Sequence, residues 1–270
     1  MKTLYISDLD GTLLHNNETL SKYTCDTINS LVDNGLNFSI ATARSRVTSK
    51  KVTLGLTCKI PMIVYNGTMI IDSISKKILI SNFFEKTQIL DIKSTLEYFR
   101  INPIVYSMQS NQEKFSYVSG LVNPYMKTFL DTRKYDVRRN PLIEESNLYD
   151  GNVFYFTCID DANKLKLAYD ILKVKYNCIY QKDYYSNNQW LEILPRNASK
   201  SSAILQLKDF LNCDRIVSFG DGVNDIDMFK ISNECYAVSN AIQDLKNIAT
   251  DIIGSNQDDG VAKWLSKNIL

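Results

Sequence analysis

Residues 2–12 read KTLYISDLDGT, a short apolar pattern that ends abruptly in two aspartates, a glycine and a threonine. The apolar run is too short for the core of a signal peptide and is typical of a buried strand. Asp8 and Asp10 follow it directly, so the strand is expected to deliver two carboxylates into one compact loop. The same residues also fit an ordinary acidic turn in which Thr12 caps a following helix. Taken alone, the stretch predicts a strand with an acidic carboxyl end.

The first part of the chain continues with alternating helix and strand patterns. A helix pattern at 21–34 is followed by Gly35, which is expected to be its left-handed cap, and then by a strand pattern at 36–41 that ends at Thr42. Residues 62–65 form another strand pattern, and Asn66-Gly67 after it is a hairpin signal. Strands that alternate with helices predict parallel βαβ units.

The last part of the chain repeats this alternation. A helix pattern at 198–211 precedes a strand pattern at 215–219, and the loop after that strand, 220–225, reads GDGVND. Both ends of the chain therefore predict an α/β fold with a parallel sheet. The remaining patterns of this part lie at 235–238, 241–249, 251–253 and 261–270.

The middle of the chain has a different composition. It is rich in aromatic residues and asparagine, its strand patterns are short, and acidic residues are scarce at its loop ends. We therefore predict a core made of residues 1–82 and 190–270, with an inserted α+β domain at 83–189. Helix patterns lie at 86–100 and 164–176, and strand patterns at 115–118, 153–159 and 178–180.

Composition limits the classes of protein that need to be considered. The chain has 270 residues, of which 44% are hydrophobic and 23% are charged, which is typical of one large or two modest globular domains. Its 31 basic and 30 acidic residues leave a net charge of +1, so no global field attracts nucleic acid or an anionic membrane. No run approaches the roughly 18 apolar residues of a membrane span. We expect a cytoplasmic protein.

Cysteine and histidine usage argues against several kinds of site. The six cysteines are scattered without a CxxC pair, and His15 is the single histidine. A zinc site with the usual paired spacing is therefore not expected, and mechanisms that need two histidines are excluded. Thiols in this pattern are typical of buried or incidental cysteines in a reducing compartment.

Polar residues at three strand ends are predicted to converge. Ligands of open α/β sheets bind outside the carboxyl ends of the strands, and Asp8, Thr42 and Asp221 all follow such strands. Asp221 belongs to a second acidic cluster with Asn224 and Asp225. Mg²⁺ prefers oxygen ligands and needs only one or two carboxylates, so the two acidic loops could share one ion. A glycine-bracketed turn facing water is the plainer alternative, and a calcium loop is disfavoured because the DxDxDG run is missing.

Such a cluster needs positive charge if it is to bind phosphate. Two unit charges 4 Å apart repel by about 4 kcal/mol at an effective dielectric near 20, so a metal and a basic side chain are both required. Lys200, at the start of a helix pattern, is the candidate for that side chain. Thr42 could add its hydroxyl, together with the amides of Ala43 and Arg44. Singly, a solvated lysine and a helix-capping threonine are the commoner roles.

Four of these motifs, taken in their order along the chain, resemble a known family. Asp-x-Asp-Gly-Thr, then Thr, then Lys, then Gly-Asp-x-x-Asn-Asp resembles the haloacid dehalogenase-like hydrolase superfamily, and most of all its Cof-type branch of two-domain sugar and nucleotide phosphatases. Ala43 and Ser239 depart from the pattern, because the family often has glycine at both positions. Arg44 matches the basic residue that the family usually has there, in a role that is either structural or substrate-facing. Further matches are Tyr65-Asn66-Gly67, residues 220–228, Asn240-Ala241 and Asp259-Gly260-Val261-Ala262.

The resemblance implies both a fold and an activity. The fold is a Rossmann-like, doubly wound parallel sheet with an inserted α/β cap, and the activity is Mg²⁺-dependent hydrolysis of a small phosphorylated metabolite through an aspartyl-phosphate. Asp8 would be the nucleophile and Asp10 the acid and base, while Thr42 and Lys200 hold the phosphoryl group. Phosphate would contact Leu9, Thr42, Ala43, Lys200 and Asn224, and the metal would contact Asp8, the Asp10 main-chain carbonyl, Asp221 and Asp225, the last directly or through water.

Two other functions fit the same motifs. A phosphomutase or phosphotransferase would pass the phosphoryl group to a sugar hydroxyl, and a catalytically silent protein would only bind the phosphorylated metabolite. Neither a nucleic acid nor a membrane is expected as a partner, and the sequence leaves the oligomeric state open. Six residues in or directly next to the inserted domain could contact a substrate, although aromatic residues more often pack in a core. They are Tyr117, Tyr125, Arg133, Tyr184, Tyr185 and Trp190.

Overall fold

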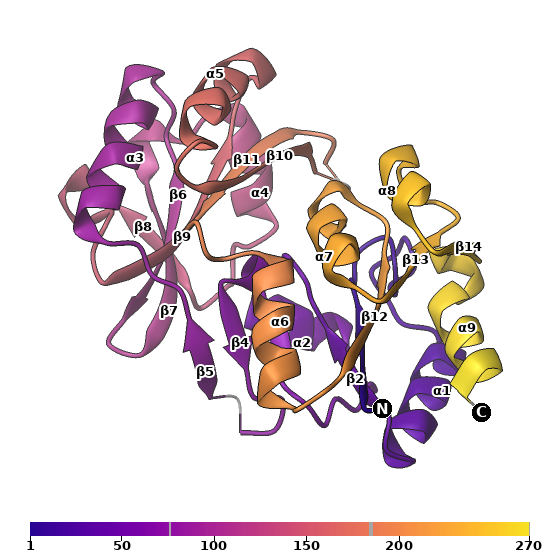
Figure 1. Ribbon diagram of the computed structural model, residues 1–270. Helices are drawn as coiled ribbons and strands as arrows, with labels where there is room; N and C mark the ends of the chain where they lie inside the picture. Colours follow the sequence, from indigo (N-terminus) through magenta and orange to yellow (C-terminus); the bar gives the residue numbers. More distant parts are fainter. Residues whose placement is uncertain (76, 184–185, 270) are drawn as a thin grey trace. The chain divides into compact units, whose positions relative to one another are not determined.

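The computed structural model describes residues 1–75, 77–183 and 186–269 and divides the chain into two compact units. Unit 1 consists of Met1–Ser81 and Ala198–Leu270, and unit 2 of Asn82–Asn197 (Figure 1). Unit 2 is thus inserted into unit 1 along the chain.

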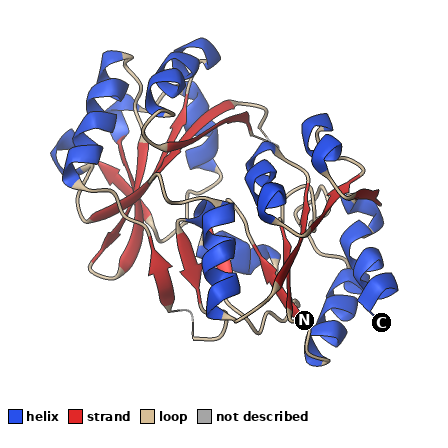
Figure 2. Cartoon of the chain, viewed as in Figure 1, coloured by secondary structure: helices blue, strands red, loops and turns tan. Residues whose placement is uncertain are grey.

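Unit 1 is built on a parallel sheet with the strand order β14-β13-β12-β1-β2. The strands at its centre are almost entirely buried and apolar, as expected for a parallel sheet covered on both faces (Figure 2). The predicted α/β class with a parallel core is confirmed. The strands are β1 (Thr3–Ser7), β2 (Asn37–Ile40), β12 (Arg215–Gly220), β13 (Glu234–Val238) and β14 (Asp251–Ile253).

The connections of this sheet create a switch point between β1 and β12. The chain passes from β1 through α1 (Lys22–Asp33) to β2 on one side, and from β12 through α7 (Ile226–Ile231) to β13 on the other. Because such crossovers are right-handed, α1 and α7 lie on opposite faces of the sheet. The carboxyl ends of β1 and β12 therefore open onto a crevice in which α/β proteins bind ligands.

The other helices of unit 1 extend these two layers. Helix α9 packs against α1, and α7 packs against both α6 and α8 (Figure 1). Helix α1 begins after Ser21, whose hydroxyl accepts from the Thr24 amide, and Gly35 follows its end with a φ of 97°, as the sequence predicts. The remaining bounds are α2 (Arg46–Val52), α6 (Lys200–Phe210), α8 (Gln243–Ile248) and α9 (Gly260–Ile269).

A small antiparallel sheet follows β2. Strands β3 (Met62–Val64) and β4 (Met69–Ile71) form a hairpin through the short 3₁₀ segment η1 (Tyr65–Gly67), and β5 (Ile78–Ser81) pairs with β4. The hairpin predicted from Asn66-Gly67 is therefore confirmed. A parallel bridge from Ala41 to Ile63 continues the main sheet into this hairpin.

Unit 2 has a mainly antiparallel sheet with the order β10-β11-β9-β6-β7-β8, as expected for an inserted α+β domain (Figure 2). Apolar residues of α3 and α5 pack on this sheet around Ile92, Phe156 and Leu165. The elements are α3 (Lys86–Tyr98), β6 (Ile104–Gln109), β7 (Gln112–Val118), α4 (Pro124–Asp131), β8 (Arg139–Leu142), β9 (Asn152–Ile159), α5 (Ala162–Leu172), β10 (Asn177–Lys182) and β11 (Gln189–Leu194).

The second boundary of unit 2 differs from the sequence prediction. We predicted that the core resumes at residue 190, whereas unit 1 resumes at Ala198. The reason is β11 (Gln189–Leu194), which pairs with β10 and β9 inside the sheet of unit 2. An apolar strand before a helix looks the same in sequence whichever sheet it joins.

Several residues singled out in the middle segment pack within unit 2. Tyr117 is buried and its hydroxyl accepts from Arg139, while Trp190 packs edge-on against Phe129. Arg133 lies over the same Phe129 ring. Tyr125 is exposed, and Tyr184 and Tyr185 lie outside the described residues.

Throughout the described ranges, no helix combines the length and apolarity that crossing a bilayer requires. All six cysteines fall in those ranges as free thiols.

Candidate active site

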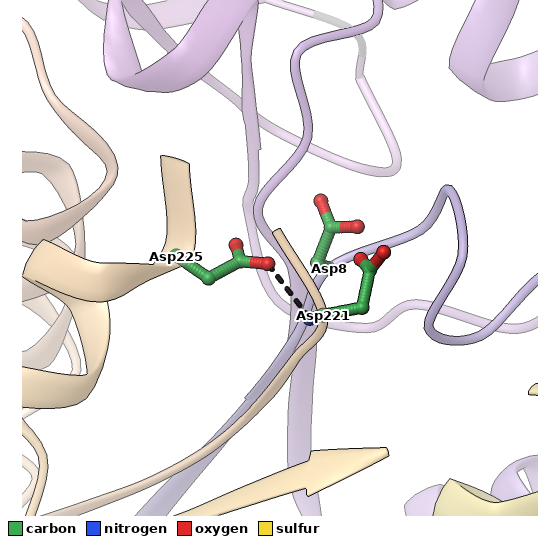
Figure 3. A group of neighbouring side chains, drawn as sticks. All are labelled: Asp8, Asp221 and Asp225. Atoms are coloured by element: carbon green, nitrogen blue, oxygen red, sulfur yellow. Dashed lines mark hydrogen bonds between the residues drawn. The ribbon is translucent and has the colours of Figure 1, made fainter. Parts of the chain in front are cut away.

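Three aspartates meet at the switch point between β1 and β12. Asp8 follows β1, and Asp221 and Asp225 follow β12 in the loop and the 3₁₀ segment η4 (Val223–Asp225). One carboxylate oxygen of each lies within 4.8 Å of the others (Figure 3). The sequence separation of more than 200 residues is bridged because β1 and β12 are adjacent parallel strands, with Ser7 opposite Phe219.

Lys200 lies within hydrogen-bond distance of two of these aspartates. It is the first residue of α6, and its side chain is only 1% exposed. Its Nζ donates to Asp8 Oδ1 at 2.5 Å and to Asp225 Oδ1 at 2.7 Å. The lysine picked from sequence is therefore the buried cation of this cluster rather than a solvated helix residue.

Asp225 is fully engaged by protein donors. While Oδ1 accepts from Lys200, Oδ2 accepts from the amides of Asp221 and Gly222, both at 3.0 Å, and the first of these bonds is drawn in Figure 3. The residue is completely buried. Asp225 is thus placed to orient Lys200 and the Asp221 loop.

Asp221 is fixed by the motif after β1. Thr12 Oγ1 donates to Asp221 Oδ1 at 2.9 Å, so the threonine of the first motif holds the aspartate of the last. Gly11 adopts a φ of 77°, and a Cβ at this position would clash with the Asp221 carboxylate. The glycine is required both by its backbone conformation and by this close approach.

Burial and like charge give the cluster unusual acid–base properties. Burial raises the pKa of Asp8 well above its usual range, opposed by Lys200 and reinforced by Asp225. Burial also raises the pKa of Asp221, to about 7, with Asp225 adding to the shift. Lys200 behaves in the opposite way, since burial alone would lower its pKa but the Asp225 and Asp8 carboxylates outweigh that and raise it. The lysine therefore stays charged.

The charge of the cluster fits a divalent cation. Three carboxylates and one ammonium sum to −2 when all are ionised. Carboxylate oxygens are the ligands that hard cations such as Mg²⁺ prefer, and Asp8 and Asp221 each supply one near the other. The residues present thus match a divalent metal in ligand type and in charge.

The predicted phosphate-binding residues lie on the neighbouring strand ends. Thr42 follows β2, the parallel neighbour of β1, and is buried; its Oγ1 accepts from the Arg44 amide at 3.1 Å. This bond engages one of the two amides expected to face phosphate. The cap of α2 is Ser45 rather than Thr42. Leu9 is buried in the loop after β1, and Ala43 is half-buried in the loop after β2.

Asn224 is held by a residue to which the sequence assigned no site role. Its Nδ2 donates to Asn66 Oδ1 at 3.0 Å, and the Asn66 amide donates to the Thr42 carbonyl at 2.9 Å. Asn66 has a left-handed φ of 50° in the hairpin turn. The turn signal thus also marks a residue that links two predicted phosphate-binding positions.

Asp10 forms a different set of contacts. Arg44 donates from Nε to Asp10 Oδ2 at 2.8 Å and from Nη2 to Asp10 Oδ1 at 2.5 Å. Burial alone would lower the pKa of Arg44, but the hydrogen bond to Asp10 helps to raise it, so the arginine is a permanent cation. Sequence reasoning left the role of Arg44 open between structure and substrate; its position two residues after Thr42 was the available signal.

The α/β fold thus carries an acidic cluster at its switch point whose residues fit a divalent metal. The model of the family described as haloacid dehalogenase-like hydrolase matches residues 5–265. The chain belongs to the haloacid dehalogenase-like hydrolase family, and the predicted resemblance is confirmed.

Individual proteins agree with this assignment. The chain is 27% identical to the 5-amino-6-(5-phospho-D-ribitylamino)uracil phosphatase of Bacillus subtilis, over 99% of this chain and 98% of the relative. A solved haloacid dehalogenase-like hydrolase of B. subtilis has the same fold, with a TM-score of 0.80 at 20% identity and 100% coverage of both chains. Another, from Bacteroides thetaiotaomicron, gives 0.78 at 22% identity and 99% coverage of both.

Proposed function

We propose that this hydrolase is a Mg²⁺-dependent phosphatase that cleaves a small phosphorylated metabolite through an aspartyl-phosphate on Asp8. The observation that carries the proposal is the buried contact between the Lys200 ammonium and the Asp8 carboxylate beside Asp221. An ammonium in this position can neutralise and orient phosphoryl oxygens while the adjacent carboxylate attacks phosphorus. The phosphatase names of relatives that match along nearly the whole chain support the same reaction class.

In the first half of the reaction, Asp8 displaces the alcohol of the ester. A carboxylate oxygen of Asp8 forms a bond to phosphorus as the bond from phosphorus to the ester oxygen breaks. Asp10 gives its proton to that oxygen, so the product leaves as a neutral alcohol. Lys200 and Thr42 hold the phosphoryl oxygens, with Leu9, Ala43 and Asn224 lining the same loops.

In the second half, water releases the phosphate. Asp10, now ionised, takes a proton from a water molecule as that water attacks phosphorus. The bond between phosphorus and the Asp8 oxygen breaks, which restores the carboxylate and yields inorganic phosphate. Mg²⁺, when bound by Asp8, Asp221 and the Asp10 carbonyl, would neutralise charge on the phosphoryl group.

Phosphate release from a panel of esters tests the proposal. The panel should contain p-nitrophenyl phosphate, hexose phosphates and the phosphorylated ribitylaminouracil named for the B. subtilis relative. We expect release with Mg²⁺ and at least about a hundredfold less with a chelator, because without the metal the cluster keeps a net charge of −2 that repels the phosphoryl group. Conversion of a hexose 1-phosphate into an isomer without phosphate release would instead identify a mutase. Binding without turnover of any ester would refute the hydrolase.

The pKa of Asp221 predicts a pH dependence of metal binding. Its folded-state value of about 7 lies above the ordinary 3.8, so the metal-free folded protein keeps a proton that the unfolded chain has lost. Protonation of Asp221 therefore favours the folded state of the metal-free protein, and this stabilisation is lost as pH rises through about 7. Mg²⁺ must displace the same proton, so the gain in Tm on adding Mg²⁺ should grow between about pH 5.5 and about pH 8.5.

Thermal unfolding with and without MgCl₂ across this range measures the effect. The matched variant is Asp221→Asn, which has no proton to release at this position and should show a smaller gain in Tm that changes less with pH, the remaining change coming from Asp8. A gain in the unmodified protein that is constant over the range would contradict Asp221 as a metal ligand.

A further inference from the structure

Glu18 shares the arginine that holds Asp10. Arg44 Nη2 donates to Glu18 Oε2 at 2.8 Å as well as to Asp10, so one guanidinium bridges two carboxylates. The side chain of Arg44 is 14% exposed and that of Asp10 is 25% exposed, whereas Glu18 reaches the pair from the surface with 44% exposed. Glu18 thereby holds Nη2 of the guanidinium, while the Nε and Nη2 edge of the same group faces Asp10.

Glu18 has an uncommon backbone conformation for its residue type. Its φ is 61°, in the left-handed region that favours glycine. The conformation closes a tight turn, in which the Glu18 amide donates to the His15 carbonyl and the His15 amide donates to the Thr19 carbonyl, both at 2.9 Å. A glycine would close this turn without strain, so the carboxylate at this position is the feature that needs an explanation.

The loop that carries Glu18 is anchored from the far end of unit 1. The buried Asn256 donates through Nδ2 to the Leu14 carbonyl at 2.8 Å and to Asn16 Oδ1 at 2.9 Å. His15 Nε2 lies 3.1 Å from Asp259 Oδ1, just after this asparagine in the chain. Residues 14–16, at the amino end of the turn, are therefore held in place by these contacts, and Glu18 extends from a fixed backbone.

We propose that Glu18 is a positioning residue for Asp10, acting through Arg44; this role rests on the phosphatase function proposed above. The two bonds from Arg44 fix the plane of the Asp10 carboxyl group, and each bond uses one lone-pair direction on its oxygen. Glu18 holds the guanidinium in the orientation that makes both bonds possible. Without Glu18, the guanidinium loses one of the contacts that orient it, and Asp10 is aimed less consistently at the ester oxygen that it must protonate.

A pair of esters that differ in leaving group tests this role. Phenyl phosphate and p-nitrophenyl phosphate have similar shapes. Nitrophenolate departs without being protonated, whereas the more basic phenolate depends more strongly on protonation as it leaves. The parameter kcat/KM reports the steps up to the departure of the leaving group. We expect Glu18→Gln to lower kcat/KM about tenfold for phenyl phosphate and less than about twofold for p-nitrophenyl phosphate, since acid catalysis matters mainly for the poorer leaving group.

Two further variants separate positioning from structure. Glu18→Gly keeps the left-handed turn and removes the carboxylate, so it should show the same selective loss; full activity would mean that only the turn matters. Glu234→Gln is the matched control, because Glu234 also pairs with an arginine, Arg215, but at the amino end of β13. Glu234→Gln should leave kcat/KM unchanged for both esters.

The outcomes distinguish this role from the function on which it rests. Equal losses for the two esters in Glu18→Gln, or no loss for either, would overturn the positioning role while leaving the phosphatase intact. Absence of turnover by the unmodified chain on every ester would refute the phosphatase and, with it, the role of Glu18.

Discussion

Replacement of Lys200 by methionine should abolish turnover and destabilise the fold at the same time. The substitution leaves the buried Asp8 and Asp225 carboxylates without the ammonium that now contacts both. Removing one partner from a buried ion pair costs about 3–5 kcal/mol, which we expect as a lower free energy of unfolding in urea. We also expect kcat/KM to fall by at least about a thousandfold, because the phosphoryl oxygens lose their fixed cation.

An exposed lysine of the same unit provides the control. Lys230 pairs with Asp227 at 3.1 Å, but its side chain is 63% exposed. Lys230→Met should change the free energy of unfolding by less than about 0.5 kcal/mol and leave turnover intact. Loss of stability without loss of turnover in Lys200→Met would contradict the role assigned to this lysine.

Asp8→Asn should separate catalysis from stability. The substitution removes the nucleophile, so phosphate release from p-nitrophenyl phosphate should fall by at least about ten-thousandfold. The fold should be retained, with an unchanged or higher Tm, because Lys200 keeps its pair with Asp225 and one desolvated charge disappears. Phosphate-release assays and thermal unfolding of the same preparation measure both effects.

The matched control again uses the exposed pair. Asp227→Asn makes the same chemical change at a side chain that is 65% exposed and should leave turnover and Tm unaffected. Turnover that persists in Asp8→Asn would remove Asp8 as the nucleophile.

Much of the fold could be predicted from the sequence because its signals are local. The apolar pattern before Asp8, the cap at Gly35 and the hairpin at Asn66-Gly67 each specify an element, and the alternation of elements predicts the parallel sheet. The boundary at Ala198 could not be predicted, since strand pairing is a long-range property and β11 has no local mark of its partner strands.

The site shows the same division between local and long-range information. Aspartates at strand ends could be predicted to converge, and the structure brings Asp8, Asp221 and Asp225 together with Lys200. The residues that orient these groups could not be predicted. Thr12 contacts Asp221 and Asn66 contacts Asn224, in each case across more than 150 residues of sequence. In the sequence alone, a threonine here is equally typical of a helix cap, and an asparagine of an ordinary turn.

Trapping of the phosphorylated enzyme tests the central claim most directly. The protein is quenched during turnover of p-nitrophenyl phosphate with Mg²⁺ and treated with borohydride, which reduces an acyl phosphate to an alcohol. Peptide mass spectrometry then locates the reduced residue. Phosphorylation of Asp8 predicts homoserine at position 8, and no such product in Asp8→Asn. Reduction at another carboxylate, or an unmodified position 8 in enzyme that is turning over, would contradict the account.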